Sequence, residues 1–166
     1  MEILIFFSRN FSSTSNFISS PDNEADVFVL KLASSGSHIS FSTIMGGPGN
    51  ETSTTIALDS QGNACVTGST NSLNFPSSGV SSSTINQGSN KLFFLKLSEN
   101  SSILLYSRII GTLQVISGMN ISVDASNNIC IAGNGNSNLF VMKIFPVKNE
   151  TLLEFYFRIN NIDINF

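Results

Sequence analysis

The repeat that decides the fold is Phe28-Val29-Leu30-Lys31-Leu32, which returns 65 positions later as Phe93-Phe94-Leu95-Lys96-Leu97. The same shift carries Ile56-Ala57-Leu58-Asp59 onto Ile121-Ser122-Val123-Asp124. A fixed period of this length is typical of repeat architectures, in which each unit buries its apolar faces against its neighbour. The sequence therefore predicts a duplicated, β-rich module.

Four short strand signals recur in the same order. In the complete copy they cover residues 55–59, 64–70, 92–97 and 103–110. The first two are joined by a tight turn, in which Gly62 of one copy becomes Asn127 of the next. Gly and Asn are the residues that most readily adopt the positive φ of a tight hairpin. No segment has apolar residues at helical spacing, so we expect an all-β fold with almost no helix.

The strand at residues 92–97 is apolar on both of its faces. Phe93 and Leu95 lie on one side of the predicted strand, and Phe94 lies beside Lys96 on the other. A half-exposed strand would alternate between apolar and polar residues, whereas a strand covered on both faces need not. We therefore expect this strand to lie between two other sheets.

The remaining segments fit the same scheme. We expect strands at residues 3–7, ahead of the strand at 28–32, and at residues 152–159, as a last outer strand. Residues 38–45 alternate between polar and apolar, which predicts an outer strand with one face in water. Ile162-Asp163-Ile164-Asn165-Phe166 also alternates, and is a candidate for the first strand that the initial unit lacks.

The composition narrows the class of protein. Of the 166 residues, 41% are hydrophobic, which is enough for a real core, and only 11% are charged, against about 25% in an average soluble domain. The net charge is −3 and the eight Lys and Arg are scattered, so nothing favours nucleic-acid binding. No stretch approaches the roughly 18 apolar residues of a membrane-spanning helix. Glu2 precedes the short run at 3–7, which argues against a signal peptide there.

The two cysteines, Cys65 and Cys130, occupy the same place in successive copies. Stacked sheets lie about 10 Å apart, which exceeds the roughly 7 Å between Cα atoms that a disulfide tolerates. We therefore expect two free, buried thiols. Two cysteines are also too few ligands for a metal site.

No group of residues has the spacing of a catalytic site. His38 is the only histidine and is expected on the solvent face of its strand, so no serine has a base beside it. Gly46-Gly47-Pro48-Gly49 is not followed by the Lys-Ser/Thr pair of a phosphate-binding loop, and is interpreted as a turn between units. We expect neither enzymatic activity nor a cofactor.

Charged residues recur at two places in the repeat, and with Gly62 and Asn127 they are the structural repeat positions. Asp59 and Asp124 begin the tight turn, where a carboxylate accepts N–H groups of the turn; calcium binding is the alternative. The recurring lysines are each expected to lay an aliphatic stem along a neighbouring sheet, with the ammonium group in water or on an acceptor. Pairing with Asp59 or Asp124 across units is the other interpretation. These lysines are Lys31, Lys96 and Lys143.

Several phrases of the chain resemble the β-propeller repeat family known as SBBP. They are residues 26–32, Phe41-Ser42-Thr43-Ile44-Met45-Gly46-Gly47-Pro48-Gly49, residues 56–70 and Asn74-Phe75-Pro76. The resemblance covers most of residues 25–145 and implies a propeller of several four-stranded blades. It also implies a cell-surface or extracellular protein without general enzymatic activity, although no signal peptide is recognised in this chain. The second copy departs from the pattern, because Gly111-Thr112-Leu113 replaces Gly-Gly.

The chain is predicted to be a single repeat domain, residues 1–166, forming an incomplete propeller arc of about three antiparallel blades. Residues 1–53 would form a partial blade, 54–117 a full blade and 118–166 a shortened blade. The expected function is a non-catalytic scaffold or binding module for a protein or glycan, within a longer repeat protein and able to self-associate through open blade edges. Two alternatives stay open. The chain is part of a propeller enzyme whose active site lies on missing blades, or it is a truncated gene product without function.

Overall fold

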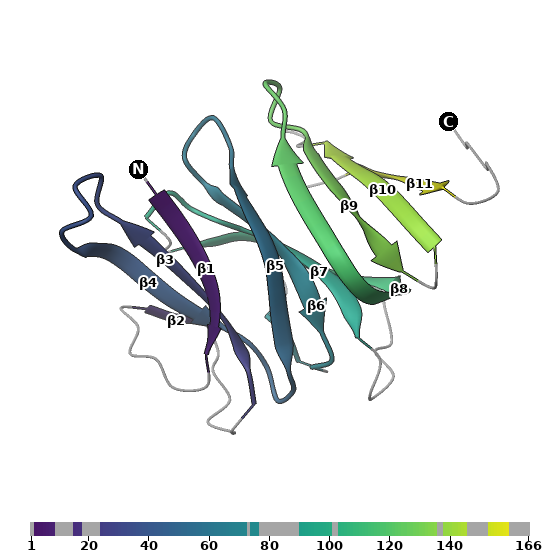
Figure 1. The fold of residues 1–166 in the computed structure, drawn as a ribbon, viewed down its shortest axis with the longest axis horizontal. Coiled ribbons are helices and arrows are strands. Elements are labelled where there is room, and N and C mark those ends of the chain that lie inside the picture. The colour runs from purple at the N-terminus through teal and green to yellow at the C-terminus, as the bar shows by residue number, and fades with distance from the viewer. Residues whose placement is uncertain are drawn as a thin grey trace.

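The computed structural model describes residues 2–8, 15–17, 24–72, 74–76, 90–100, 103–135, 138–145 and 153–159. The regular secondary structure of these residues consists of strands alone, which confirms the all-β prediction (Figure 1). No helix in this part of the chain is long and apolar enough to span a membrane. The strands are β1 (Glu2–Ser8), β2 (Ser15–Phe17), β3 (Asp26–Leu32), β4 (Ile39–Met45), β5 (Glu51–Leu58), β6 (Ala64–Thr70), β7 (Lys91–Leu97), β8 (Leu104–Val123), β9 (Ile129–Gly135), β10 (Asn138–Phe145) and β11 (Leu153–Ile159).

The first sheet has the strand order β1-β3-β4-β2. β1 runs antiparallel to β3, with Ile3 opposite Lys31, and β3 runs antiparallel to β4. The strand predicted at residues 3–7 is therefore confirmed. β2 is a short strand that the sequence did not predict, and it pairs with β4 in the parallel direction.

β4 is less exposed than the alternation of residues 38–45 predicts. Its first residue, Ile39, is 44% exposed, whereas Ser42 and Thr43, which lie further along, are buried. β2 pairs with β4 from Thr43 to Met45, so this half of β4 has a neighbouring strand on both edges. The strand that we expected to have one face in water is therefore exposed to solvent only at its beginning.

The second sheet has the order β11-β10-β9-β8-β7-β6-β5, and each neighbouring pair in it is antiparallel. β8 is 20 residues long and passes from one half of this sheet to the other. It pairs with β7 as far as Gln114 and with β9 from Val115 onward. We call β5, β6, β7 and the first half of β8 the middle segment. The second half of β8 with β9, β10 and β11 is the last segment.

The sequence predicts separate strands at residues 103–110 and 121–124, whereas the structure has the continuous strand β8. The corresponding connection in the first copy is Gly46-Gly47-Pro48-Gly49, and there the strand ends, at Met45. Pro lacks a backbone N–H and Gly weakens a strand, so this run interrupts pairing. Gly111-Thr112-Leu113 contains no such break, and the chain continues as strand with only shifts of register.

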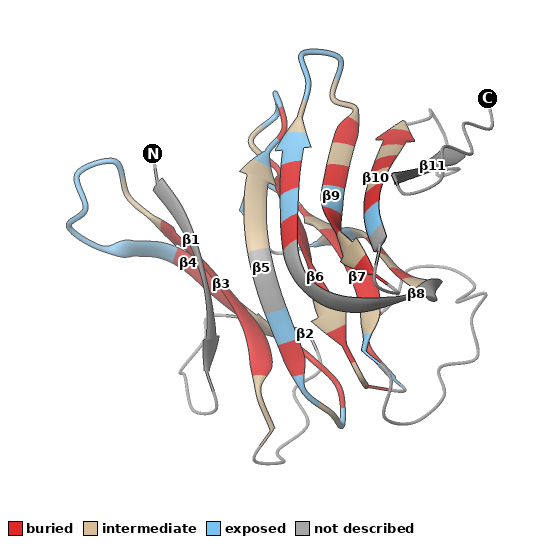
Figure 2. Ribbon diagram, turned by 45° about the vertical axis from the view of Figure 1, so that its right-hand side comes forward, coloured by how far each residue is buried: buried red, intermediate tan, exposed pale blue. Residues whose placement is uncertain are grey.

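Both faces of the middle segment are buried, as Figure 2 shows along β6 and β7. On one face, Phe93 and Leu95 of β7 pack in a cluster with Val29 of the first sheet. On the other face, Phe94 packs in a separate cluster with Ile131 of the last segment. All three β7 side chains are at most 1% exposed. The prediction that this strand is covered on both faces is confirmed, although its neighbours are the first sheet and the last segment of its own sheet, and the three groups of strands lie side by side (Figure 1).

The strand predicted at residues 152–159 is confirmed as β11, which pairs with β10. The candidate strand at residues 162–166 lies outside the described residues. The unit boundaries after residues 53 and 117 stay predictions.

Candidate functional site

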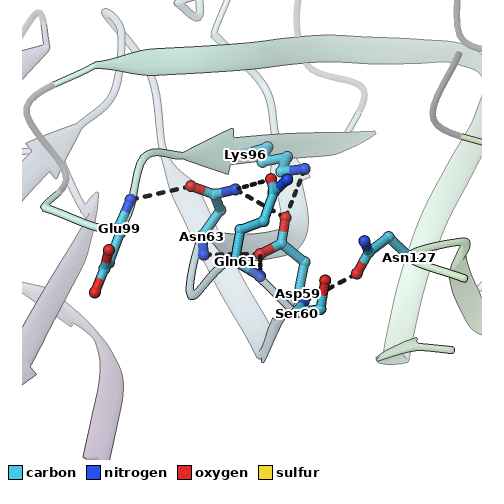
Figure 3. Close-up of polar contacts among 7 residues, drawn as sticks. All are labelled: Asp59, Ser60, Gln61, Asn63, Lys96, Glu99 and Asn127. Carbon is cyan, nitrogen blue, oxygen red and sulfur yellow. Dashed lines mark hydrogen bonds and ion pairs between the residues drawn. The ribbon is translucent and has the colours of Figure 1, made fainter. Parts of the chain in front are cut away.

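The turn between β5 and β6 is closed by the carboxylate of Asp59 (Figure 3). Its Oδ1 accepts hydrogen bonds from the backbone N–H groups of Gln61 and Asn63, each at 2.9 Å. Its Oδ2 accepts a hydrogen bond from Asn63 Nδ2 at 2.9 Å and lies 2.7 Å from Lys96 Nζ. Gly62 has a φ of 80°, and its N–H donates to the carbonyl oxygen of Asp59 at 3.0 Å. One carboxylate therefore closes the turn and ties it to β7.

The turn between the second half of β8 and β9 repeats this arrangement around Asp124. Oδ1 accepts hydrogen bonds from the N–H groups of Ser126, at 2.9 Å, and Asn128, at 2.8 Å. Oδ2 accepts one from Asn128 Nδ2 at 2.8 Å and lies 3.1 Å from Lys143 Nζ. Asn127, with a φ of 63°, takes the place of Gly62. The repeated sequence positions thus carry a repeated set of contacts.

Each lysine–aspartate pair forms within one segment of the sheet. Lys96 on β7 pairs with Asp59 of the middle segment, and Lys143 on β10 pairs with Asp124 of the last segment. The interpretation that the recurring lysines pair with Asp59 or Asp124 across units is therefore wrong. In each of these segments, a single strand separates the third strand from the first. The lysine of the third strand can therefore reach the aspartate at the end of the first strand. The lysine also supplies the positive charge that a calcium ion would otherwise bring.

Both aspartates have a pKa below the ordinary value for the group. Burial acts to raise the pKa of Asp59, but the hydrogen bonds from Lys96 and Asn63 outweigh it. The pKa of Asp124 is lowered to about 2, chiefly by the side-chain hydrogen bond from Asn128. Both carboxylates are therefore ionised at neutral pH, and their negative charge strengthens the hydrogen bonds that they accept.

Lys31 occupies the same strand position in the first sheet but has a different partner. Its Nζ donates a hydrogen bond to the carbonyl oxygen of Glu99 at 3.1 Å and lies 3.8 Å from the Glu99 carboxylate Oε1. Glu99 belongs to the turn after β7, so Lys31 reaches from the first sheet to the middle segment. The ammonium group also lies 5.8 Å from the ring centroid of Phe41. A groove of about 600 Å³ opens beside these side chains.

The turns of neighbouring segments are also joined to one another (Figure 3). The N–H of Ser60 donates to Asn127 Oδ1 at 2.9 Å, which links the hairpin turns of the middle and last segments. The N–H of Glu99 donates to Asn63 Oδ1 at 3.1 Å, which links the two turns of the middle segment. These bonds fix the relative positions of the lysine–aspartate pairs along one end of the strands.

A second polar cluster lies at the opposite end of β5, around the buried carboxyl group of Glu51. Its Oε1 accepts hydrogen bonds from the hydroxyl groups of Thr70, at 2.6 Å, and Ser72, at 2.5 Å. Its Oε2 accepts one from the N–H of Gly47 at 3.1 Å. The N–H of Glu51 donates to the carbonyl oxygen of Ala25 at 2.7 Å. The cluster therefore connects the middle segment to the chain that enters β3.

The carboxylate of Asp26 lies close to that of Glu51, with Gly46 beside both. A Cβ atom at Gly46 would overlap the Asp26 carboxylate and lie 2.7 Å from Glu51 Oε2, so only glycine permits this approach. Burial raises the pKa of Glu51 to about 7, against the hydrogen bonds from Ser72 and Thr70, and the charge of Asp26 adds to the rise. The sequence reasoning missed this cluster. Its one signal is a glutamate two residues after the Gly-Gly-Pro-Gly turn, at the start of a run of Ser and Thr.

Phe75, in the segment after β6, is buried in the hydrophobic core. The Phe75 ring stacks on the Phe93 ring with centroids 4.7 Å apart, and the hydroxyl of Ser107 donates to the carbonyl oxygen of Pro76 at 2.5 Å. From β4 to this point the chain runs through the glycine turn, the Glu51 cluster and the Asp59 hairpin. Residues 41–76 match the SBBP family, a beta-propeller repeat. The predicted resemblance to SBBP is thereby confirmed over these residues.

The matched residues include the carboxylates of Glu51 and Asp59, whereas Asp26 and Lys96, which complete the two clusters, lie outside them. No curated protein sequence matches the chain. The glycine run, interpreted from the sequence as a turn between units, connects β4 to β5. The end of β5 next to this run is hydrogen-bonded to the chain that enters β3 of the first sheet. The Asp59 hairpin, at the other end of β5, is hydrogen-bonded to the turn of the last segment.

The remaining sequence candidates lie outside these clusters. His38 is exposed, and its Nδ1 lies 3.1 Å from the hydroxyl oxygen of Ser37. Both cysteines are free, and burial raises the pKa of the Cys65 thiol to about 12. Cys130 was expected to be buried but is only half-buried, because its side of β9 faces away from the middle segment. Within the described ranges, no three His, Cys, Asp or Glu side chains are placed to hold a metal ion.

Proposed function

We propose that the chain is a non-catalytic scaffold and binding module, in which three propeller blades form an open arc. The first sheet, the middle segment and the last segment are the blades. The SBBP match over residues 41–76 and the antiparallel all-β fold support a propeller-type scaffold. Propellers usually close with about four to eight blades, so this arc is one part of a larger assembly.

The observation that carries the proposal is a comparison of equivalent faces of the middle segment and the last segment. Lys143 takes the place of Lys96, so Leu139 and Val141 correspond to Leu92 and Phe94. Leu92 is fully buried against the last segment, whereas Leu139 is 53% exposed. The face that receives a neighbour in the middle segment is thus presented to solvent in the last segment.

A scaffold role also fits the chemistry of the polar residues. The carboxylates of Asp59 and Asp124 accept hydrogen bonds from their turns and pair with lysines, which commits them to holding the blades. A nucleophile activated by a neighbouring base is the usual mark of a catalytic site, and His38 is exposed, with its Nδ1 beside the hydroxyl group of Ser37. A protein or a glycan is the partner class that such a scaffold would bind, at the cell surface or outside the cell.

Light scattering on the purified chain and on Leu139→Lys tests the proposal. We expect the wild-type chain to form a defined oligomer through the open face of the last segment, because an exposed apolar face is stabilised by association. Leu139→Lys places a charge on that face and should yield single chains. Leu105→Lys is the matched control, since Leu105 is 44% exposed on β8 and does not belong to that face.

Two results would contradict the proposal. One is a wild-type chain that stays single at high concentration. The other is an irregular aggregate that neither substitution changes, which would favour a remnant without function.

A further inference from the structure

The third strand of each blade carries a lysine, and two of the three lysines hold an aspartate. Lys96 Nζ lies 2.7 Å from Asp59, and Lys143 Nζ lies 3.1 Å from Asp124. In both cases the aspartate directly follows the innermost strand of the same blade. Lys31 stands at the same position of the first sheet, where an aspartate or glutamate would be the equivalent partner.

Within the part of the chain that the structure describes, the first sheet lacks the strand that would bring this aspartate. In the middle segment, Lys96 lies opposite Cys65 of β6, and Cys65 lies opposite Ala57 of β5, two residues before Asp59. In the first sheet, Lys31 lies opposite Ile3 of β1. Among the residues that the structure describes, no strand pairs with the other edge of β1. An added strand with a residue opposite Ile3 would place an acid, two residues later, where Asp59 lies in the middle segment.

The present partner of Lys31 is a weak substitute. The Lys31 side chain is 9% exposed, yet the Glu99 carboxylate with which it pairs lies 3.8 Å from its Nζ and is 66% exposed. A buried ammonium group is stabilised most by a close carboxylate that is itself shielded from water. A groove of about 600 Å³ lies beside Lys31 and Glu99.

We propose that the open edge of β1 binds an extended segment of a partner protein, in which a short apolar run like Ile56-Ala57-Leu58 is followed by Asp or Glu. The segment adds a strand to the first sheet through backbone hydrogen bonds, and its acid pairs with Lys31. The inference rests on the proposed function, because it names the partner class of the same scaffold. It selects an acidic peptide strand and excludes a glycan at this edge.

A labelled peptide with the sequence of residues 52–61 is the probe, since it carries the innermost strand and Asp59. Fluorescence anisotropy measures its binding to the full chain. We expect saturable binding, weakened about tenfold when the peptide carries Asn in place of Asp59, because a buried charge-assisted contact is lost. Lys31→Met should weaken the Asp peptide to the level of the Asn peptide. Lys143→Met is the matched control, because Lys143 already has Asp124, and it should leave binding unchanged.

The outcomes separate this inference from the scaffold proposal. Absent binding, or equal binding of the Asp and Asn peptides, would overturn the inference, while the light-scattering result with Leu139→Lys would stand by itself. The two peptides are compared on the wild-type chain, so the test holds even if Lys31→Met fails to fold. A chain that lacks residues 160–166 is measured in parallel. Binding only after this deletion would show that the chain's own end occupies the edge, and would also overturn the inference.

Discussion

The charge state of Glu51 depends on the fold. Its pKa is raised from 4.5 to about 7, because it is buried beside the Asp26 carboxylate. The folded chain therefore binds a proton that the unfolded chain releases, and the stabilisation is complete below the unfolded pKa of 4.5 and lost as the pH rises through about 7. This dependence could not be predicted from the sequence, because it arises from segments that meet only in space.

Glu51→Gln removes the titrating group while keeping its shape. We expect the urea midpoint of the wild-type chain to fall between about pH 5 and about pH 8, and that of the variant to change much less. Glu99→Gln, at an exposed glutamate on the turn after β7, is the control and should keep the wild-type pH dependence. An unchanged pH dependence in Glu51→Gln would show that another group is responsible.

The hairpin turns are the elements that the sequence described best. Each hairpin could be recognised from residues that are close in the sequence, namely its strands, its aspartate and the Gly or Asn of its turn. The structure has hairpins at both places. The sequence did not predict β2 or the continuity of β8. Strand pairing between distant residues decides the first, and the absence of a break at residues 111–113 allows the second.

The two hairpins differ in burial, which predicts a difference in stability. The Asp59 side chain is 1% exposed, and that of Asp124 is 39% exposed. We expect Asp59→Asn to lower the free energy of unfolding by about 3 kcal/mol, because it leaves the partly buried Lys96 without a counter-charge. Asp124→Asn should cost clearly less, since water screens its pair. Urea unfolding of both variants at neutral pH provides the comparison, and equal losses would contradict the assigned role of burial.

At the scale of the whole molecule, stability depends on stacking between the sheets. Phe94 is 1% exposed between the middle and last segments, and its counterpart Val141 is only half-buried on the outer face. We expect Phe94→Ala to lower the free energy of unfolding by about 3 kcal/mol, and Val141→Ala to lower it by about 1 kcal/mol. Both variants should unfold in one transition, because each sheet depends on its neighbour. Thermal denaturation checks this, and two separate transitions would indicate independent sheets.

The sequence by itself determined the strands other than β2 and the continuous β8, the hairpins and the burial of a doubly apolar strand on both faces, because alternation and period are properties of the order of residues. Only the tertiary structure decided that Lys96 and Lys143 pair within their own segments, that Lys31 reaches Glu99 of another segment and that Glu51 is buried beside Asp26. These contacts join residues far apart in the chain, and their energies depend on distance and on exclusion of water, which the order of residues does not specify.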